Sequence, residues 1–365
     1  MENHANIISD RRLSAWEKLR RKILFAFRLT DQPTVKIYHG YGNGKKVIVF
    51  GHLLLFSPVP RKHYSRNFLT NTFALIRLFI VKPYPKAWVK MQWEGAWIFT
   101  QAEDDGFFRF ELPVSSPLKP GWHEVQVVLL GRNRDNPGIA TGKGSYYIPY
   151  SNQFAMISDI DDTFLVSHSS NLRKRLFVLL TENAHSRQPF EGVVRHYQLL
   201  ARAGARHTES NPFFFVSSSE WNLYDYIREF AIKQQLPQGV YLLNQLKPFR
   251  QLWKTGQNNH STKFMRIVRI IEAYPEQKFI LLGDDTQEDP TIYASIVSHF
   301  PGKVIAVYLR KVRKKTKPTV LPAIGKMKEA GVHCCYFGHS EEAISDSVSI
   351  GLIHLPAASS ETVGV

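Results

Sequence analysis

The spacing of apolar residues changes twice along the chain, which predicts three structured parts. Apolar positions recur at helical spacing near the start, alternate with polar ones in short runs up to about residue 150, and then form buried runs separated by helical patterns. The last residues are small and polar. We therefore divide the chain into a basic amphipathic N-terminal helix (1–33), a β-sandwich-like domain (34–150), an α/β domain (151–340) and a disordered tail (341–365).

The N-terminal segment predicts a helix with one apolar face. Leu13, Trp16, Leu19, Ile23 and Phe27 fall at helical spacing, and basic residues occupy much of the remaining surface. Two interpretations stay open. The helix packs its apolar stripe on its own domain, or it lies on an anionic membrane with its basic side chains at the headgroups.

The middle segment predicts a small antiparallel β-sandwich. Its short runs are divided by Gly, Pro and Asn, and several alternate in period two, as Phe108, Phe110 and Leu112 do against Arg109 and Glu111. The glycine-rich stretch "HGYGNG" precedes another strand pattern rather than a helix, so we interpret it as a turn and not as a nucleotide loop.

The third segment predicts an α/β fold. Alternating strands and helices favour a parallel sheet with helices on both faces, and such sheets bind ligands at the carboxyl ends of their strands. Two of the expected helices span 221–235 and 262–273. The expected strands span 154–158, 213–216, 240–243, 279–282 and 304–308.

Composition narrows the partners and the compartment. With 47 Lys and Arg against 31 Asp and Glu, the net charge of +16 favours polyanionic partners: nucleic acid, an anionic membrane or phosphorylated substrates. The two cysteines, Cys334 and Cys335, are adjacent and lack the spacing of a zinc site, which favours a reducing cytoplasm. No apolar run approaches the roughly 20 residues of a membrane-spanning helix. We expect a cytoplasmic protein, with peripheral membrane contact as an open alternative.

Three polar clusters follow predicted strands. "SDIDDTF", from Ser158 to Phe164, packs three carboxylates into four residues, and such a cluster needs either solvation or a cation. "SSS" at 217–219 and "GDDTQED" at 283–289 follow two other strands of the same sheet. We expect the three clusters to converge at one edge of the sheet.

These residue types suit phosphoryl transfer. One carboxylate, Asp159, can attack phosphorus while Asp161 protonates the leaving oxygen. Asp284 can complete oxygen-only coordination of Mg²⁺. Ser217 offers a hydroxyl to a phosphate oxygen, and Lys263 offers a positive charge.

The motif order resembles that of the haloacid-dehalogenase-like (HAD-like) phosphohydrolase superfamily. The motifs are "DIDDT", Ser217 after "FFFV", Lys263 near a helix start, and Gly283-Asp284 with Asp289. More narrowly, "SSSEWNLYDYI" and "STKFMRIVRIIEAYPEQKFILLGDDTQEDPTIY" resemble the catalytic core of the phosphatidate phosphatase family named for an actin-patch protein. The resemblance covers roughly residues 38–311 and implies a HAD-like Rossmannoid parallel sheet.

The resemblance also implies roles. Asp159 would form an aspartyl-phosphate, and Asp161 would act as general acid and then as the base that activates water. Lys263, held by Asp289, would stabilise the nucleophile and the intermediate. The implied phosphate-binding residues are Thr163, Ser217 and Ser218, and the implied Mg²⁺ ligands are Asp159, Asp284 and the backbone carbonyl of Asp161.

Two positions depart from the family pattern. Asp285 stands beside Asp284, where it either tightens metal binding or faces solvent, and we count it as a supporting group. Glu220 stands where the family often has proline, next to the phosphate-binding serines, so it is a candidate for altering substrate preference.

Three functional hypotheses remain. The chain is a Mg²⁺-dependent phosphatase converting phosphatidate to diacylglycerol and phosphate, a soluble phosphatase for a small metabolite or protein, or a non-catalytic lipid-binding protein. The basic run 310–317 is interpreted as a solvated segment, with headgroup contact as the alternative. We expect no nucleic-acid partner, since no nucleic-acid module accompanies that run. Residues 164–211 form either a cap over the site or an interfacial element.

Overall fold

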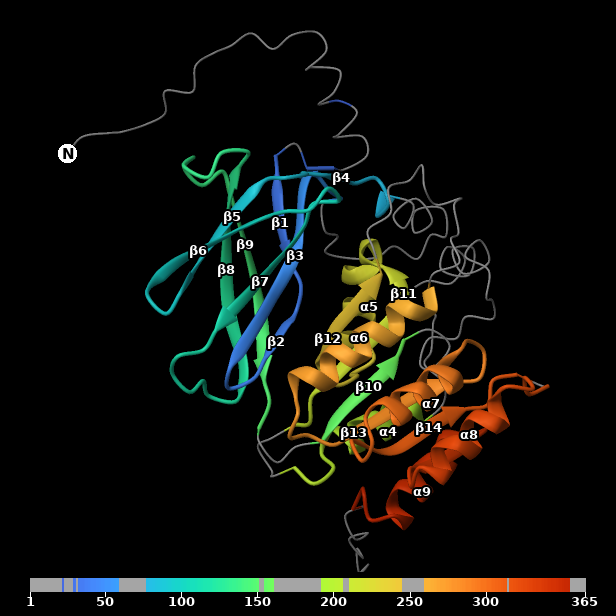
Figure 1. Cartoon of the computed structure of the whole chain (residues 1–365). Coiled ribbons are helices and arrows are strands. Elements are labelled where there is room, and N and C mark those ends of the chain that lie inside the picture. Colours follow the sequence, from blue (N-terminus) through green and yellow to red (C-terminus); the bar gives the residue numbers. More distant parts are fainter. Residues whose placement is uncertain are drawn as a thin grey trace, which may run out of the picture.

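The computed structural model describes residues 22, 29–30, 32–58, 77–150, 154–160, 192–205, 210–244, 259–313 and 315–354. These residues form two sheets with helices around the second (Figure 1). Almost all of the predicted N-terminal helix lies outside the described residues, as do Asp161, Thr163 and most of the candidate cap. Within the described residues, no helix is both long and apolar enough to cross a bilayer.

The first sheet contains the nine strands of the middle segment, joined by hydrogen bonds into one network. The long strand β3 pairs with β1, β2, β4 and β7, and all described pairs are antiparallel except that of β2 with β9. The predicted short antiparallel strands are confirmed, and the sandwich packing stays a prediction. The strands are β1 (Thr34–Ile37), β2 (Gly40–Gly42), β3 (Lys46–Phe56), β4 (Lys82–Pro83), β5 (Trp88–Trp93), β6 (Ala96–Gln101), β7 (Phe107–Pro113), β8 (Gly121–Gly131) and β9 (Ala140–Ile148).

Strand β3 is buried on both faces because it separates two cores. Val47, Val49 and Leu53 join the core inside the first sheet. Ile48 and Phe50, on the opposite face, join a larger core that includes the α/β domain. Successive strand residues point to opposite faces, so the nearly continuous apolar run of β3 serves both domains.

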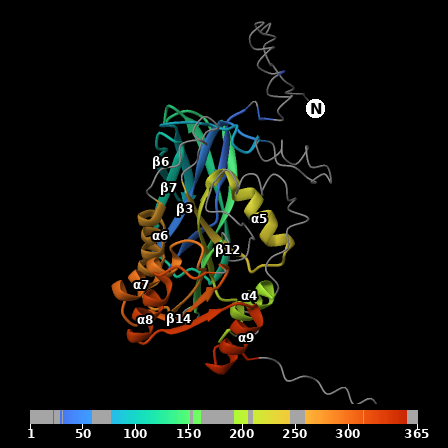
Figure 2. The same cartoon turned by 90° about the vertical axis from the view of Figure 1, so that its right-hand side faces the viewer.

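The second sheet has six parallel strands in the order β12-β11-β10-β13-β14-β15. Figure 2 shows α6, α7 and α8 on one side of it and α4, α5 and α9 on the other. The strands are β10 (Ala155–Asp159), β11 (Phe213–Glu220), β12 (Gly239–Asn244), β13 (Phe279–Asp284), β14 (Val304–Arg310) and β15 (His333–Phe337). The helices are α4 (Val193–Ala201), the short η1 (Trp221–Leu223), α5 (Tyr224–Lys233), α6 (Asn259–Ala273), α7 (Asp289–His299), α8 (Val320–Glu329) and α9 (Ser340–Ser349).

The prediction of a parallel sheet with flanking helices is confirmed, and each of the five expected strands begins within one residue of an observed strand start. The prediction of a disordered tail from residue 341 is wrong up to residue 354. Helix α9 begins with a capping box in which Glu342 accepts from the backbone N–H of His339, 3.1 Å away, and it buries Ala343 and Ile344. Its packing on α4 and β15, rather than its own polarity, decides its structure.

Polar contacts join the first sheet and its loops to the α/β domain. The ring Nδ1 of His39 lies 2.8 Å from the carbonyl oxygen of Gly239, and the amide of Asn43 donates to the carbonyl of Ala273 at 2.5 Å. The hydroxyl of Tyr147 donates to the carbonyl of Ser210 at 2.9 Å. With a shared apolar core beneath them, these bonds place the first sheet against β11, β12 and the helices that flank the candidate site.

Candidate active site

The acidic residues gather where the two central strands end. Asp159 is the last residue of β10 and Asp284 the last of β13, and these strands are parallel neighbours with Ser158 opposite Leu282. Both carboxylates are fully buried. Their apolar strand runs fix the backbone inside the core, and the carboxylates therefore meet at one edge, as predicted.

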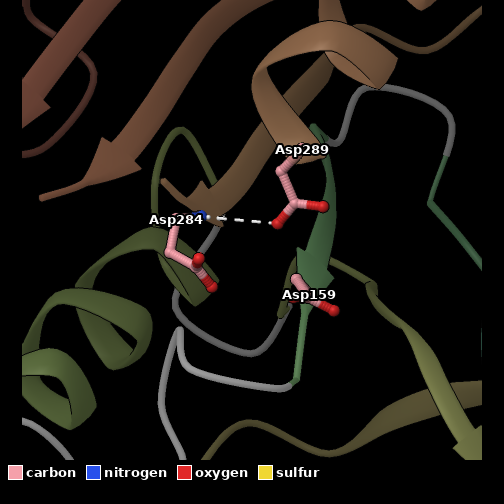
Figure 3. A group of neighbouring side chains, drawn as sticks. All are labelled: Asp159, Asp284 and Asp289. Atoms are coloured by element: carbon pink, nitrogen blue, oxygen red, sulfur yellow. Dashed lines mark hydrogen bonds between the residues drawn. The ribbon is translucent and has the colours of Figure 1, made fainter. Parts of the chain in front are cut away.

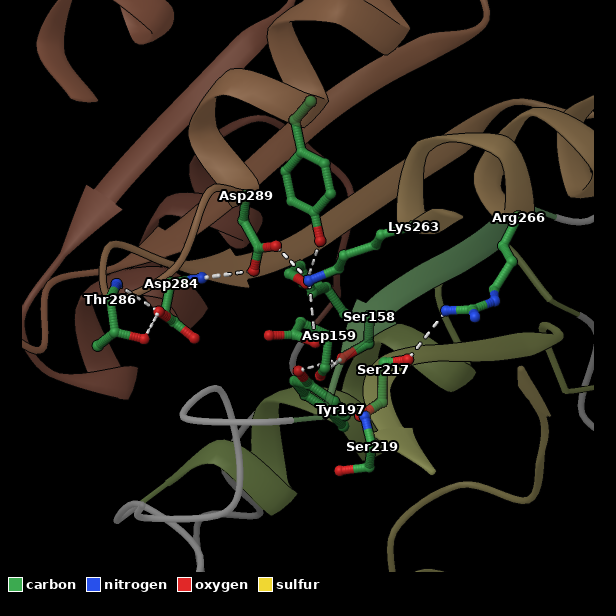
Figure 4. Close-up of polar contacts among 12 residues, drawn as sticks. Ser158, Asp159, Tyr197, Ser217, Ser219, Lys263, Arg266, Asp284, Thr286 and Asp289 are labelled. Carbon is green, nitrogen blue, oxygen red and sulfur yellow. Dashed lines mark hydrogen bonds and ion pairs between the residues drawn. The ribbon is translucent and has the colours of Figure 1, made fainter. Parts of the chain in front are cut away.

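Lys263 of α6 places a cation between Asp159 and Asp289. Its Nζ lies 3.0 Å from Oδ1 of Asp159 and donates a very short hydrogen bond to Oδ1 of Asp289, the first residue of α7 (Figure 4). Burial acts to lower the pKa of Lys263, but the two carboxylates together raise the pKa above its ordinary value. The side chain therefore remains an ammonium at neutral pH.

Asp289 comes close to the end of β13 because Gly283 has no side chain. A Cβ added at Gly283 would lie 2.7 Å from Oδ2 of Asp289 and 2.9 Å from the ring of Tyr293. The backbone N–H of Asp284 points to Oδ2 of Asp289 at 3.4 Å. The predicted partnership of Lys263 with Asp289 is thus present in the structure and depends on this glycine.

The side chain of Asp284 is oriented by Thr286. The backbone N–H and the hydroxyl of Thr286 both donate to Oδ1 of Asp284 at 2.5 Å. Such local bonds from a threonine fix the turn that follows β13. The carboxylate consequently has one position relative to Asp159.

This cluster fits a hard divalent cation. One carboxylate oxygen from each of Asp159, Asp284 and Asp289 lies within 4.8 Å of the others (Figure 3). Two cations lie near these three carboxylates: Lys263 and the buried Arg310, which is paired in register with Asp284. Three formal negative charges and two positive ones leave a net charge of −1. Oxygen ligands and a net negative charge suit Mg²⁺. Both oxygens of Asp289 already accept hydrogen bonds, Oδ1 from Lys263 and Oδ2 from the backbone N–H of Asp284, so Asp159 and Asp284 are the candidate metal ligands.

The serines of the candidate phosphate site lie inside β11 rather than after it. The register of β11 against β12 shifts between Val216 and Glu220, so Ser217 and Ser218 occupy an irregular stretch. The backbone N–H of Ser219 donates to Oγ of Ser217 at 2.9 Å. Glu220 is buried at the end of this stretch, and its role in substrate preference stays a prediction.

Arg266 is a residue of this region that sequence reasoning missed. It lies one helical turn after Lys263 on α6, and its guanidinium donates to the backbone carbonyl of Ser217 at 3.1 Å (Figure 4). The signal that could have found it is the three-residue spacing from Lys263, which places both cations on one side of the helix.

Asp285 neither faces solvent nor points to the metal cluster. It is fully buried, and its Oδ1 accepts from the backbone N–H groups of Val312 and Arg313 at 2.9 and 3.1 Å. The hydroxyl of Tyr336 donates to Oδ2 at 2.8 Å. Asp285 therefore anchors the chain after β14, and its expected role as a metal-tightening or solvated group is wrong.

The basic run 310–317 is correspondingly not a simple solvated segment. Arg313 donates to the carbonyl of Thr286 at 2.9 Å, and Nζ of Lys317 lies 3.1 Å from Oε1 of Glu288. These bonds tie the run to the loop between β13 and α7, which carries the acidic residues.

Tyr197 of α4 supports the end of β10 through a hydrogen bond. The hydroxyl of Tyr197, on α4, lies 2.7 Å from Oγ of Ser158, which precedes Asp159. Burial raises the pKa of Tyr197, so its phenol stays protonated. The end of β10 is thereby held from the α4 side of the sheet.

Comparisons with known proteins match the part of the chain that carries this candidate site. Residues 154–311 match the family described as phosphatidate phosphatase APP1, catalytic domain. The phosphatidate phosphatase APP1 of Saccharomyces cerevisiae is 26% identical over 175 residues, which are 48% of this chain and 28% of that protein. An uncharacterized protein of Schizosaccharomyces pombe is 21% identical over 215 residues, 56% of this chain and 34% of that protein. The chain thus spans only a minor part of the length of these relatives.

Likeness to solved structures is weak. The carbohydrate acetylesterase XAC1771 of Xanthomonas citri aligns with a TM-score of 0.30 and 9% identity, over 84% of this chain and 68% of that one. A likeness of that size has no bearing on function. The sequence comparison therefore shows a match limited to one part of the chain: residues 154–311 are similar to the phosphatidate phosphatase APP1 catalytic-domain family.

Proposed function

We propose that this protein is a Mg²⁺-dependent phosphatase that hydrolyses phosphatidate through an aspartyl-phosphate. The observation that carries the proposal is Lys263 bound between Asp159 and Asp289, with Asp284 beside them, at the carboxyl ends of β10 and β13. A buried carboxylate held by an ammonium suits a nucleophile, and the family match supports the substrate class. The motif order and the parallel sheet support a HAD-like domain.

In the proposed reaction, a carboxylate oxygen of Asp159 attacks phosphorus and the bond to the ester oxygen breaks. Asp161, outside the described residues, gives its proton to the leaving oxygen of diacylglycerol. It then takes a proton from the water that attacks the aspartyl-phosphate, which releases inorganic phosphate and restores Asp159. The ammonium of Lys263 offsets the negative charge of the carboxylate before attack and that of the phosphoryl group afterwards.

The metal would be held by Asp159 and Asp284, with Thr286 fixing the latter. When bound, Mg²⁺ supplies the positive charge that lets a phosphate dianion approach two carboxylates. The serines 217 and 218 and Thr163 remain the proposed phosphate contacts. Thr163 lies outside the described residues.

We also propose that the protein works in the cytoplasm and contacts an anionic membrane peripherally. A net charge of +16 favours attraction to anionic lipid headgroups. A phosphatidate substrate requires access to a lipid surface, and the basic N-terminal segment is the proposed contact.

The test is phosphate release from phosphatidate in mixed micelles, with and without Mg²⁺. The proposal predicts Mg²⁺-dependent release by the wild type that is lost in Asp159→Asn and Asp161→Asn. Release from p-nitrophenyl phosphate without release from phosphatidate would retain the chemistry and reject the lipid substrate, in favour of a soluble phosphatase. Absence of both activities would reject the phosphatase and leave a lipid-binding protein.

A further inference from the structure

Helix α6 directs two cations to the candidate site, and they are bound in different ways. Lys263 is paired with the two carboxylates Asp159 and Asp289. Arg266, three residues later, is half-buried and bonds only to neutral oxygens within the part of the chain that the structure describes. Burial, with a smaller effect of Arg269, lowers the pKa of Arg266 to about 10, so the guanidinium is still protonated at neutral pH. Within the described residues, no carboxylate hydrogen-bonded to it offsets that charge.

The two acceptors of Arg266 lie on neighbouring strands. Its Nη1 donates to the backbone carbonyl of Ser217 on β11 at 3.1 Å, and its Nη2 donates to Oδ1 of Asn244, the last residue of β12, at 3.2 Å. The regular register between these strands is interrupted between Val216 and Glu220. Arg266 therefore bridges the two strands where their ladder is irregular.

The bridge acts on the irregular part of β11 in which the N–H of Ser219 bonds back to Oγ of Ser217. This local bend, the Ser217–Ser219 turn, carries the proposed phosphate contacts. Oγ of Ser217 accepts from the N–H of Ser219, while its carbonyl accepts from Arg266. A hydroxyl can accept through its lone pairs and still donate its hydrogen, so both bonds are compatible with donation from Ser217 to a phosphate oxygen. Bonds to a charged donor are stronger than neutral ones, which suits a role in fixing the turn.

We propose that Arg266 is a positioning residue that fixes the Ser217–Ser219 turn and lends positive charge to the binding of a phosphate dianion. The inference rests on the proposed function, because it assigns the phosphate group to this turn. It predicts that Arg266 acts mainly on phosphate affinity. Arg266 should have a smaller effect on the rate of the chemical step, which depends on Asp159 and Lys263.

The test compares Arg266→Gln and Arg266→Lys with Arg269→Gln. Arg269 is an exposed arginine on the same helix and is the matched control for charge. The KM and kcat for p-nitrophenyl phosphate are measured with Mg²⁺, together with the Kd of inorganic phosphate by calorimetry. Thermal unfolding shows whether each variant is folded.

For Arg266→Gln we expect KM and the phosphate Kd to rise roughly tenfold, with kcat within about twofold of wild type. Arg266→Lys keeps the positive charge but loses the planar guanidinium, so its KM and phosphate Kd should lie between those of the wild type and Arg266→Gln. Arg269→Gln should match wild type. Wild-type phosphate affinity in Arg266→Gln, or an equal effect in Arg269→Gln, would overturn the proposal.

Three further outcomes are decisive. If Arg266→Gln does not fold, Arg266→Lys decides: weakened phosphate affinity supports the role, and unchanged affinity rejects it. A wild type that hydrolyses no phosphomonoester refutes the proposed function, whereas the phosphate Kd still tests Arg266 by itself. A wild type that binds no phosphate overturns both.

Discussion

The ring of Tyr38 stacks on the ring of Trp221, with centroids 4.0 Å apart and planes 14° from parallel. Tyr38 lies between β1 and β2 of the first sheet, and Trp221 follows directly on β11, four residues after Ser217. Both side chains are buried. The first sheet thus supports the segment that leads out of the proposed phosphate-binding turn, and the two domains share one core.

Replacing Trp221 should therefore destabilise the whole molecule. Removing a buried tryptophan ring leaves a cavity, and we expect Trp221→Ala to lower the free energy of unfolding by about 3 kcal/mol. Trp97, which is 50% exposed, provides the control, and Trp97→Ala should change stability by less than about 1 kcal/mol. Chemical denaturation of both variants measures the difference. Equal effects of the two substitutions would contradict a shared core.

A methyl group at Gly283 should disturb the site. The added Cβ would meet Asp289 at 2.7 Å and force its carboxylate away from Lys263. We expect Gly283→Ala to reduce kcat/KM by at least about tenfold, equivalent to about 1.4 kcal/mol of transition-state stabilisation. A Cβ added at Gly325, within α8, would meet open space, so Gly325→Ala should keep activity and raise stability by up to about 1 kcal/mol. Full activity of Gly283→Ala would show that the approach of Asp289 is unimportant.

Divalent metal should stabilise the folded protein. Asp159 and Asp284 are buried like charges, and a cation that binds only the folded state adds about 2.7 kcal/mol at a hundred times its Kd. We expect Mg²⁺ to raise Tm and a chelator to reverse the rise. Asp284→Asn removes one charged ligand and should strongly reduce the Mg²⁺-induced shift. An undiminished shift in that variant would place the metal elsewhere.

Stability should fall in mild acid because of buried histidine. His196 is 2% exposed, its Nε2 lies 3.0 Å from Oγ of Ser347, and burial, aided by Arg310, lowers its pKa from 6.5 to about 3. Below pH 6.5 the unfolded chain binds a proton that the folded chain does not, so the stabilisation present above pH 6.5 is lost as pH falls. From pH 7 to 5 this single group should cost about 2 kcal/mol.

The variant His196→Gln should remove that part of the pH dependence in urea unfolding measured at pH 7, 6 and 5. Burial also lowers the pKa values of His39 and His52, so their contributions to the pH dependence should remain in this variant. Replacing the exposed His354 by glutamine is the control and should leave the pH dependence unchanged. An identical slope in wild type and His196→Gln would refute the assignment.

The sequence predicted the parts of the fold whose signal is local. The run "FILLGD" is apolar and then acidic, which indicated both β13 and the position of Asp284. By contrast, β15 ("HCCYF") is half-buried and short, and α9 ("SEEAISDSVS") has only small or scattered apolar residues. Their structure depends on packing against each other and on α4, which the sequence pattern does not contain.

The same distinction applies to the site. Asp159, Asp284 and Asp289 were predicted to converge because their clusters follow parallel strands with a clear apolar pattern, and the carboxyl ends of such strands meet at one edge of the sheet. The place of Lys263 beside Asp289 was implied only by the family resemblance. Asp285 was misinterpreted because its partners, Val312 and Arg313, are distant in sequence.

The most direct test of the central claim is to trap the phosphorylated enzyme. Wild-type protein is mixed with phosphatidate and Mg²⁺ and quenched in acid within the first turnover. The phosphorylated peptide is then identified by mass spectrometry. We predict covalently bound phosphate on Asp159 of the wild type and no covalently bound phosphate in Asp159→Asn. Continued phosphate release without any acyl-phosphate, or release by Asp159→Asn at the wild-type rate, would contradict Asp159 as the nucleophile.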